Sequence, residues 1–321
     1  MRRVAITALV VGLLVGTTAA FAITQALKLE RSPIKAPRFS RAFSPTCDCP
    51  QSSARLAFQL RRADSLDIGV VDKDGEEVRQ LEDGVRHPVG TVALRWDGRD
   101  GAEAVVPDGL YRLRVHLDDD RRTIVIPNRI RVDTKAPRIQ VVGLEPQVIS
   151  PDGDGVRDFM TVRARVSERA LPVVLIDGAP ADRGRWADRG RTSFRWPGTV
   201  RGKALASGRY QFALQARDAA GNVSAPTTSA SVRIRFVEVV PSRLKARRGG
   251  VLRFHVETDA SEFRVRLFRR GDRQDPLLSA HADSPTLAVP LPRRIPAGRY
   301  VLRVTAAGHD EDVPVRVRAR G

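Results

Sequence analysis

Three aspartates in one glycine-rich stretch are the residues of this sequence best suited to bind a metal ion. The stretch reads Ile-Ser-Pro-Asp-Gly-Asp-Gly-Val-Arg-Asp and contains Asp152, Asp154 and Asp158. Carboxylates are the hard oxygen ligands that Ca²⁺ prefers, although the bidentate glutamate that closes an EF-hand loop is missing. We predict a calcium site at these three residues. The alternative is that their side chains accept hydrogen bonds from the backbone of their own turn.

The remaining reactive side chains do not form a pattern typical of catalysis. Cys47 and Cys49 are one residue apart, which allows a local disulfide, intermolecular bridges, a metal site or a redox site. The histidines are scattered, and the sequence contains neither a Gly-x-Ser-x-Gly elbow nor a phosphate-binding glycine loop. We therefore predict that the protein is not an enzyme and that it uses no cofactor other than the calcium considered above.

The spacing of the three tyrosines indicates the kind of domain on which the aspartates and cysteines lie. Tyr111, Tyr210 and Tyr300 each follow a Gly-x pair and open a run of β-strand character. Their separation of about 100 residues suits a series of immunoglobulin-like β-sandwiches. We predict that each ring covers the edge of a core and that each hydroxyl donates to nearby backbone, as in a tyrosine corner.

Strand patterns extend over the chain after the first 30 residues. Apolar residues alternate with arginines in runs such as Arg112-Leu-Arg-Val115, which is typical of strands with one face in a core. Trp96 and Trp196 precede Tyr111 and Tyr210 at similar distances and are predicted to fill cores. The predicted fold is all-β, with three tandem immunoglobulin-like domains over residues 46–132, 133–235 and 236–321.

Two of these domains resemble known bacterial modules. The run Trp96-Asp-Gly-Arg-Asp-Gly101, followed by Pro107-Asp-Gly-Leu-Tyr111, resembles the FlgD-type immunoglobulin-like domain of flagellar hook-capping proteins, which also occurs in secreted bacterial proteases. The stretch that contains Asp152 is similar to the opening of immunoglobulin-like modules in bacterial surface proteins. These resemblances imply β-sandwich folds at the cell surface, without the hook-assembly function.

The N-terminal residues predict export. Two arginines precede the uncharged segment 4–27, which is long enough for a transmembrane helix. We predict a signal-anchor helix over residues 1–27, a basic stalk over residues 28–45, and a single-pass membrane protein with an extracytoplasmic C-terminal part. Cleavage after a signal peptide, which would release a secreted protein, is the alternative.

The net charge of +18 suggests an anionic partner. Residues 1–45 contribute +6, the first domain −2, and the second and third domains +7 each. Because 49 of the 55 basic residues are arginine, genome composition explains the charge better than nucleic-acid binding does. We predict a structural, adhesive or interaction scaffold of the bacterial envelope whose partner is a protein or an anionic cell-wall polymer. The alternatives are a spacer that presents a partner enzyme at the wall, or a dedicated binder of that polymer.

Overall fold

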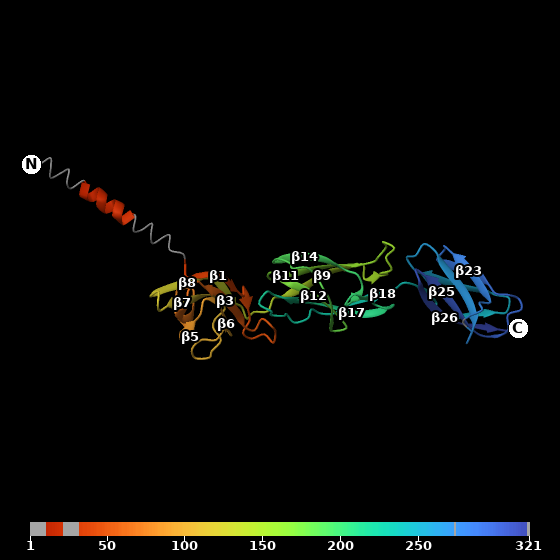
Figure 1. The fold of residues 1–321 in the computed structure, drawn as a ribbon. Coiled ribbons are helices and arrows are strands. Elements are labelled where there is room, and N and C mark those ends of the chain that lie inside the picture. Colours follow the sequence, from red (N-terminus) through yellow and green to blue (C-terminus); the bar gives the residue numbers. More distant parts are fainter. Residues whose placement is uncertain (1–10, 22–31, 273, 320–321) are drawn as a thin grey trace, which may run out of the picture. The chain divides into compact units, whose positions relative to one another are not determined.

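The computed structural model describes residues 11–21, 32–272 and 274–319 (Figure 1). The chain divides into two compact units, residues 1–134 and 135–321. The prediction of an all-β fold is confirmed, because β1 to β26 and one short helix account for the regular structure of the described residues. The strands enclose three separate hydrophobic cores, of which the first lies in the first unit and the other two lie in the second.

The first module consists of a five-stranded and a three-stranded sheet around one core. The larger sheet has the order β2 (Ala42–Phe43), β8 (Arg122–Val132), β7 (Gly109–Leu117), β4 (Asp64–Val71) and β5 (Glu77–His87). The smaller sheet has the order β1 (Ile34–Phe39), β3 (Ala54–Leu60) and β6 (Gly90–Trp96). Alternate residues of β3 and β7 are buried, as expected for strands with one solvated face.

The second module repeats this arrangement. Its larger sheet has the order β10 (Val148–Ile149), β18 (Ala230–Ile234), β17 (Gly208–Arg217), β12 (Leu171–Ile176) and β13 (Ala179–Arg183). Its smaller sheet contains β14 (Gly190–Trp196), β11 (Met160–Val166) and β9 (Ile139–Glu145), and a separate hairpin joins β15 (Thr199–Val200) to β16 (Lys203–Ala204).

The third module has the same two sheets. The larger one has the order β20 (Leu244–Arg247), β26 (His309–Arg318), β25 (Gly298–Ala306), β22 (Phe263–Arg269) and β23 (Leu278–Ala282). The smaller one has the order β19 (Glu238–Val240), β21 (Val251–Glu257) and β24 (Thr286–Pro290). In all three modules a short strand pairs in parallel with the last long strand, so equivalent positions can be compared between modules.

The first module begins earlier than the sequence predicts. Residues 34–43, assigned above to a basic stalk, form β1 and β2, which are equivalent to the first two strands of each later module. The register of β1 shifts between Lys35 and Arg38, next to Pro37. Because proline cannot donate to a ladder, it is confined to edge strands and bulges. Because of this local irregularity, β1 lacks the alternation of apolar and polar residues by which the other strands are recognised in the sequence. Residues 28–31 of the predicted stalk lie outside the described residues.

The prediction of a membrane anchor over residues 1–27 is wrong. The helix found there covers residues 11–21, which at 1.5 Å per residue is about half of a hydrocarbon core. Among the described residues, no helix has both the length and the apolar character needed to span a membrane. The predicted helix was too long because its length was taken from the run of uncharged residues 4–27. Residues 1–10 and 22–27 of the predicted span lie outside the described residues.

The tryptophans and tyrosines named above connect the sheets to the cores. Trp96 and Trp196 end β6 and β14 and are 1% and 0% exposed. Tyr111 and Tyr300 are buried, whereas Tyr210 is half-buried. Each tyrosine hydroxyl donates to a carbonyl four residues earlier, at 2.7 Å to Pro107, 2.9 Å to Ala206 and 2.7 Å to Pro296.

We expect the loss of a buried tyrosine hydroxyl to destabilise its module. Tyr300→Phe removes the bond to Pro296 and leaves that carbonyl without its partner, at a cost of about 1 kcal/mol. Tyr210→Phe is the matched control, because its hydroxyl bond is exposed and water can replace the donor. Hydrogen exchange of β25 and β17 in the full chain measures both losses. An equal loss at the two positions would contradict the role of burial.

Candidate metal site and charged surfaces

The loop between β10 and β11 carries the predicted metal ligands, and Asp158 holds this loop together. The two carboxylate oxygens of Asp158 accept the backbone N–H groups of Gly153 at 2.7 Å and of Gly155 at 2.8 Å. Both glycines have positive φ values, a conformation that residues with a side chain rarely adopt. Asp158 therefore fixes the loop backbone, which is the alternative role that the sequence allowed for these aspartates.

Asp152 and Asp154 also accept backbone N–H groups of this loop, from Asp154 at 3.3 Å and from Val156 at 2.6 Å, and in addition they meet a carboxylate from the third module. Carboxylate oxygens of Asp152, Asp154 and Asp259 all lie within 4.8 Å of one another. Asp259 follows β21 and lies more than 100 residues after Asp152, so the two segments meet at the junction of the second and third modules. Sequence reasoning missed Asp259, because a single aspartate in a short loop carries no spacing signal.

The environment of Asp152 disfavours its charged form. Oδ1 of Asp259 is buried and has no hydrogen-bond partner among the described residues. Burial, followed by the charges of Asp154, Asp259 and Asp158, raises the pKa of Asp152 above its usual range. Three oxygen ligands around one point are suitable for a hard divalent cation, which would neutralise the mutual repulsion. Backbone carbonyls and water would complete its coordination.

The same junction is built from a stacked ring pair and two salt bridges. Phe236 belongs to the core of the second module, and its ring stacks on His309 of the third at 3.6 Å between centroids and an angle of 4°. Arg235 forms an ion pair with Glu257, and Arg233 contacts Glu238 at 2.7 Å. These contacts join β18 and the two residues that follow it to β19, β21 and β26, within one compact unit.

Cys47 and Cys49 form a disulfide in the loop between β2 and β3. Among the alternatives that the sequence left open, the structure therefore has the local bridge. Both cysteines lie in tight turns, because Cys47 donates its N–H to Ser44 and Cys49 accepts from Ser52. A disulfide of this kind persists in oxidising compartments and is rare in a reducing cytosol.

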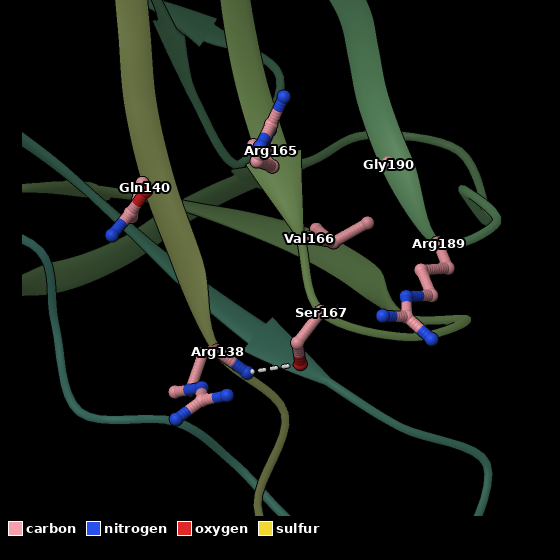
Figure 2. Close-up of a pocket in the computed structure, with 7 residues that line it drawn as sticks. All are labelled: Arg138, Gln140, Arg165, Val166, Ser167, Arg189 and Gly190. Atoms are coloured by element: carbon pink, nitrogen blue, oxygen red, sulfur yellow. Dashed lines mark hydrogen bonds between the residues drawn. The ribbon is translucent and has the colours of Figure 1, made fainter.

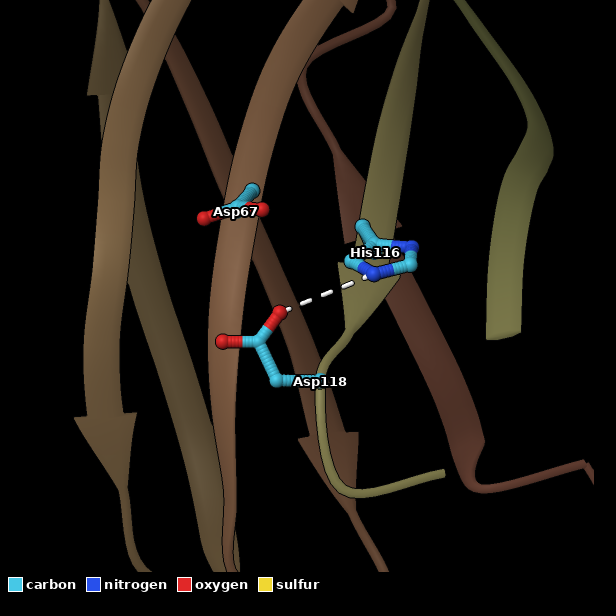
Figure 3. A group of neighbouring side chains, drawn as sticks. All are labelled: Asp67, His116 and Asp118. Carbon is cyan, nitrogen blue, oxygen red and sulfur yellow. Dashed lines mark ion pairs between the residues drawn. The ribbon is translucent and has the colours of Figure 1, made fainter. Parts of the chain in front are cut away.

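A second group of titratable side chains lies on the outer face of the first module (Figure 3). Asp67 and His116 face each other across β4 and β7, and His116 contacts Asp118 at 3.6 Å. Two of the three side chains have structural roles: Asp67 accepts the N–H of Gly84 at 2.7 Å, and His116 shares a hydrogen bond with Thr123. Asp67 thus links β4 to β5, whereas His116 links β7 to β8.

The second module contains a hollow of about 430 Å³ that is bordered by arginines (Figure 2). Arg138 and Arg189 lie on either side of Ser167, whose hydroxyl accepts the N–H of Arg138 at 2.9 Å. Arg165 also lines the hollow. None of these three guanidinium groups pairs with an acidic residue of the described part of the chain. The hollow can attract a small anion electrostatically.

Solved structures with similar folds consist of tandem β-sandwich modules. Fibronectin(III)-like modules of Clostridium thermocellum CbhA are 16% identical and match 63% of this chain and 91% of theirs, with a TM-score of 0.33. Titin domains I67–I69 are 14% identical over 89% of this chain and 99% of theirs, with a TM-score of 0.28. A chain from a structural study of a 1.5-MDa bacterial ice-binding adhesin is 14% identical over 90% of this chain and 99% of its own, with a TM-score of 0.25. No curated protein matches the chain.

The family comparison concerns the first module. Residues 46–120 match the model of the FlgD Ig-like domain. This range contains β3 to β7, together with Trp96, Tyr111 and the turn between them, on which the resemblance seen in the sequence rests. The prediction of a FlgD-type immunoglobulin-like domain is therefore confirmed over residues 46–120, within the first module.

Proposed function

We propose that the protein is an exported, non-enzymatic interaction scaffold of the bacterial envelope, in which immunoglobulin-like modules hold binding surfaces in a fixed relation. The observation that carries this proposal is the junction of the second and third modules. Phe236 is 2% exposed and contributes to one core while it stacks on His309 of the next module. A flexible chain of independent modules would need no such shared residue. The disulfide supports an oxidising location.

The fixed junction is testable by distance measurement in the full chain. Spin labels on cysteines introduced at the exposed residues Ser193 and Ser279 report the separation of the second and third modules. We expect a narrow distance distribution, which His309→Ala broadens because it removes the stacked ring without opening the core of the second module. His281→Ala, an exposed histidine of the third module, is the matched control. A broad distribution in the unsubstituted protein would refute the scaffold.

A second candidate function is calcium-dependent stiffening of this junction. It is favoured by the convergence of Asp152 and Asp154 with Asp259 and by the unpartnered Asp259 oxygen. In this proposal the cation is coordinated from both modules, and Asp158 orients the loop without binding the ion. The substitution of Asp259 distinguishes this arrangement from a calcium site confined to the second module.

A further inference from the structure

The larger sheet of the third module carries a row of four basic residues on neighbouring strands. Lys245 of β20 faces Arg316 of β26, and Arg316 in turn faces Arg299 of β25. Arg270, directly after β22, donates its N–H to the carbonyl of Arg299 at 3.2 Å. All four residues are exposed. With strands about 4.8 Å apart, the row extends about 14 Å across the sheet.

No acidic side chain of the described residues neutralises the positive charges of this row. Like charges directly opposite each other on neighbouring strands are destabilising. None of the four residues has an ion pair with an acidic residue in the described ranges 32–272 and 274–319. On the same face, Arg303, four residues after Arg299, binds Asp312 through two hydrogen bonds of 2.7 and 2.8 Å. Arg247 and Arg318, which face each other beside the row, form no ion pair with an acidic residue of the described ranges. The uncompensated positive charge of this face therefore covers the row and the neighbouring Arg247–Arg318 pair, and it ends at Arg303.

The equivalent positions of the other modules lack the row. In the first module Arg131 faces Ala42 and Leu110. In the second module Arg233 faces Val148 and Arg209, and Glu238 neutralises Arg233 at 2.7 Å. Since the three modules share one topology, an arginine-rich genome alone does not account for a row that is complete in only one of them.

The row borders a groove of about 550 Å³, which Arg243 also lines. Between the basic residues, Val301 and Pro314 contribute apolar surface to the groove. Repeated cations with apolar surface between them match a chain in which anionic groups alternate with short carbon spacers. A single small anion would engage only part of a row of this length.

From this geometry we propose that the third module binds a linear phosphodiester polymer of the cell envelope, with successive phosphates on Lys245, Arg316, Arg299 and Arg270. Guanidinium groups bind phosphate oxygens through paired, charge-assisted hydrogen bonds. The one aromatic residue that lines the groove, Tyr300, is 2% exposed and its hydroxyl is bonded to Pro296, so it offers no surface for base stacking. The groove thus favours a polymer without bases. This binding gives the proposed scaffold one of its ligands.

The test measures binding of poly(glycerol phosphate) to the full chain at several salt concentrations. We expect a slope of log K against log salt of about −3, from four phosphate contacts. The triple substitution Lys245→Gln, Arg299→Gln, Arg316→Gln is expected to lower affinity at least about tenfold and to reduce the slope by about 2. The control Arg253→Gln, Arg293→Gln, Arg294→Gln removes the same charge from other exposed sites of this module and is expected to retain the affinity.

Three results would overturn the proposal. The first is an equal loss of affinity in the two triple variants, which would indicate unspecific charge attraction. The second is tighter binding through the row to duplex DNA or to vesicles of phosphatidylglycerol than to the polymer. The third is unchanged affinity in Arg299→Leu, which copies the residue of the first module. Removing like charges is expected to leave the melting temperature unchanged or higher, so loss of folding does not obscure the result. The spin-label distances test the scaffold independently of this binding.

Discussion

Replacement of Trp96 by alanine is expected to cost the first module about 3–5 kcal/mol, which is a large part of the stability of a typical domain. Trp96 is 1% exposed and packs edge-on against Phe43 at 5.4 Å and Tyr111 at 5.1 Å between ring centroids. Its indole N–H also donates to the carbonyl of Arg99 at 3.0 Å. Alanine would leave a cavity at the point where the two sheets and the following turn meet.

The measurement has to resolve single modules, because a chain with three cores does not unfold as one two-state unit. Hydrogen exchange of the central strands β4 and β7 in the full chain reports on the first module alone. A loss of about 3 kcal/mol accelerates exchange through global opening more than about 100-fold, whereas β22 and β25 of the third module are expected to keep their rates.

Trp186→Ala is the matched control, since this tryptophan of the second module is 47% exposed and the guanidinium of Arg169 lies 5.9 Å from its ring centroid. We expect a change of less than about 1 kcal/mol. In Trp196→Ala the large acceleration of hydrogen exchange is expected in β12 and β17 of the second module. Trp196 is fully buried against Phe212, and its indole N–H donates to the carbonyl of Thr199. Unchanged exchange in β4 and β7 of Trp96→Ala would show that the first core does not depend on this ring.

The features that the sequence predicted are those set by local pattern. Gly-x-Tyr followed by alternation marks β7, β17 and β25, because a strand with one buried face must alternate. Trp96 and Trp196 were recognisable because large aromatic residues at similar distances before the tyrosines fill equivalent places in the two cores. The third module has no tryptophan. Leu291, which follows β24 and is 5% exposed, belongs to its core, and its N–H donates to the carbonyl of Gly250.

Most of the features that the sequence did not predict depend on contacts between distant segments. Asp259 joins Asp152 only because two modules meet at Phe236, and no local spacing encodes that contact. The basic row is invisible in the sequence for the same reason: its members come from four segments, and only the strand register brings them into line. The edge strands β1 and β2 were missed because Pro37 and the adjacent bulge interrupt the alternation.

Calcium is expected to stabilise the junction of the second and third modules, and Asp259→Asn is expected to abolish that effect. A ligand present at 100 times its dissociation constant adds about 2.7 kcal/mol to the state that binds it. In a calcium chelator the variant is expected to be as stable as the unsubstituted protein or more stable, because it removes one of three repelling carboxylates. At saturating Ca²⁺ the order of stability is expected to reverse, so that the unsubstituted protein is the more stable of the two.

This reversal separates a shared site from its alternatives. Asp283→Asn, an exposed aspartate of the third module, is the matched control and is expected to keep the full gain from calcium. If Asp259→Asn keeps the gain and Asp154→Ala loses it, the ion is held within the second module, as the sequence alone predicted. If Ca²⁺ leaves the melting curve of the unsubstituted protein unchanged, the aspartates serve only the loop.

Asp158→Ala cannot decide between these outcomes, because the two carboxylate oxygens of Asp158 hold Gly153 and Gly155, so its loss disturbs the loop in every case. Asp259 therefore provides the decisive substitution.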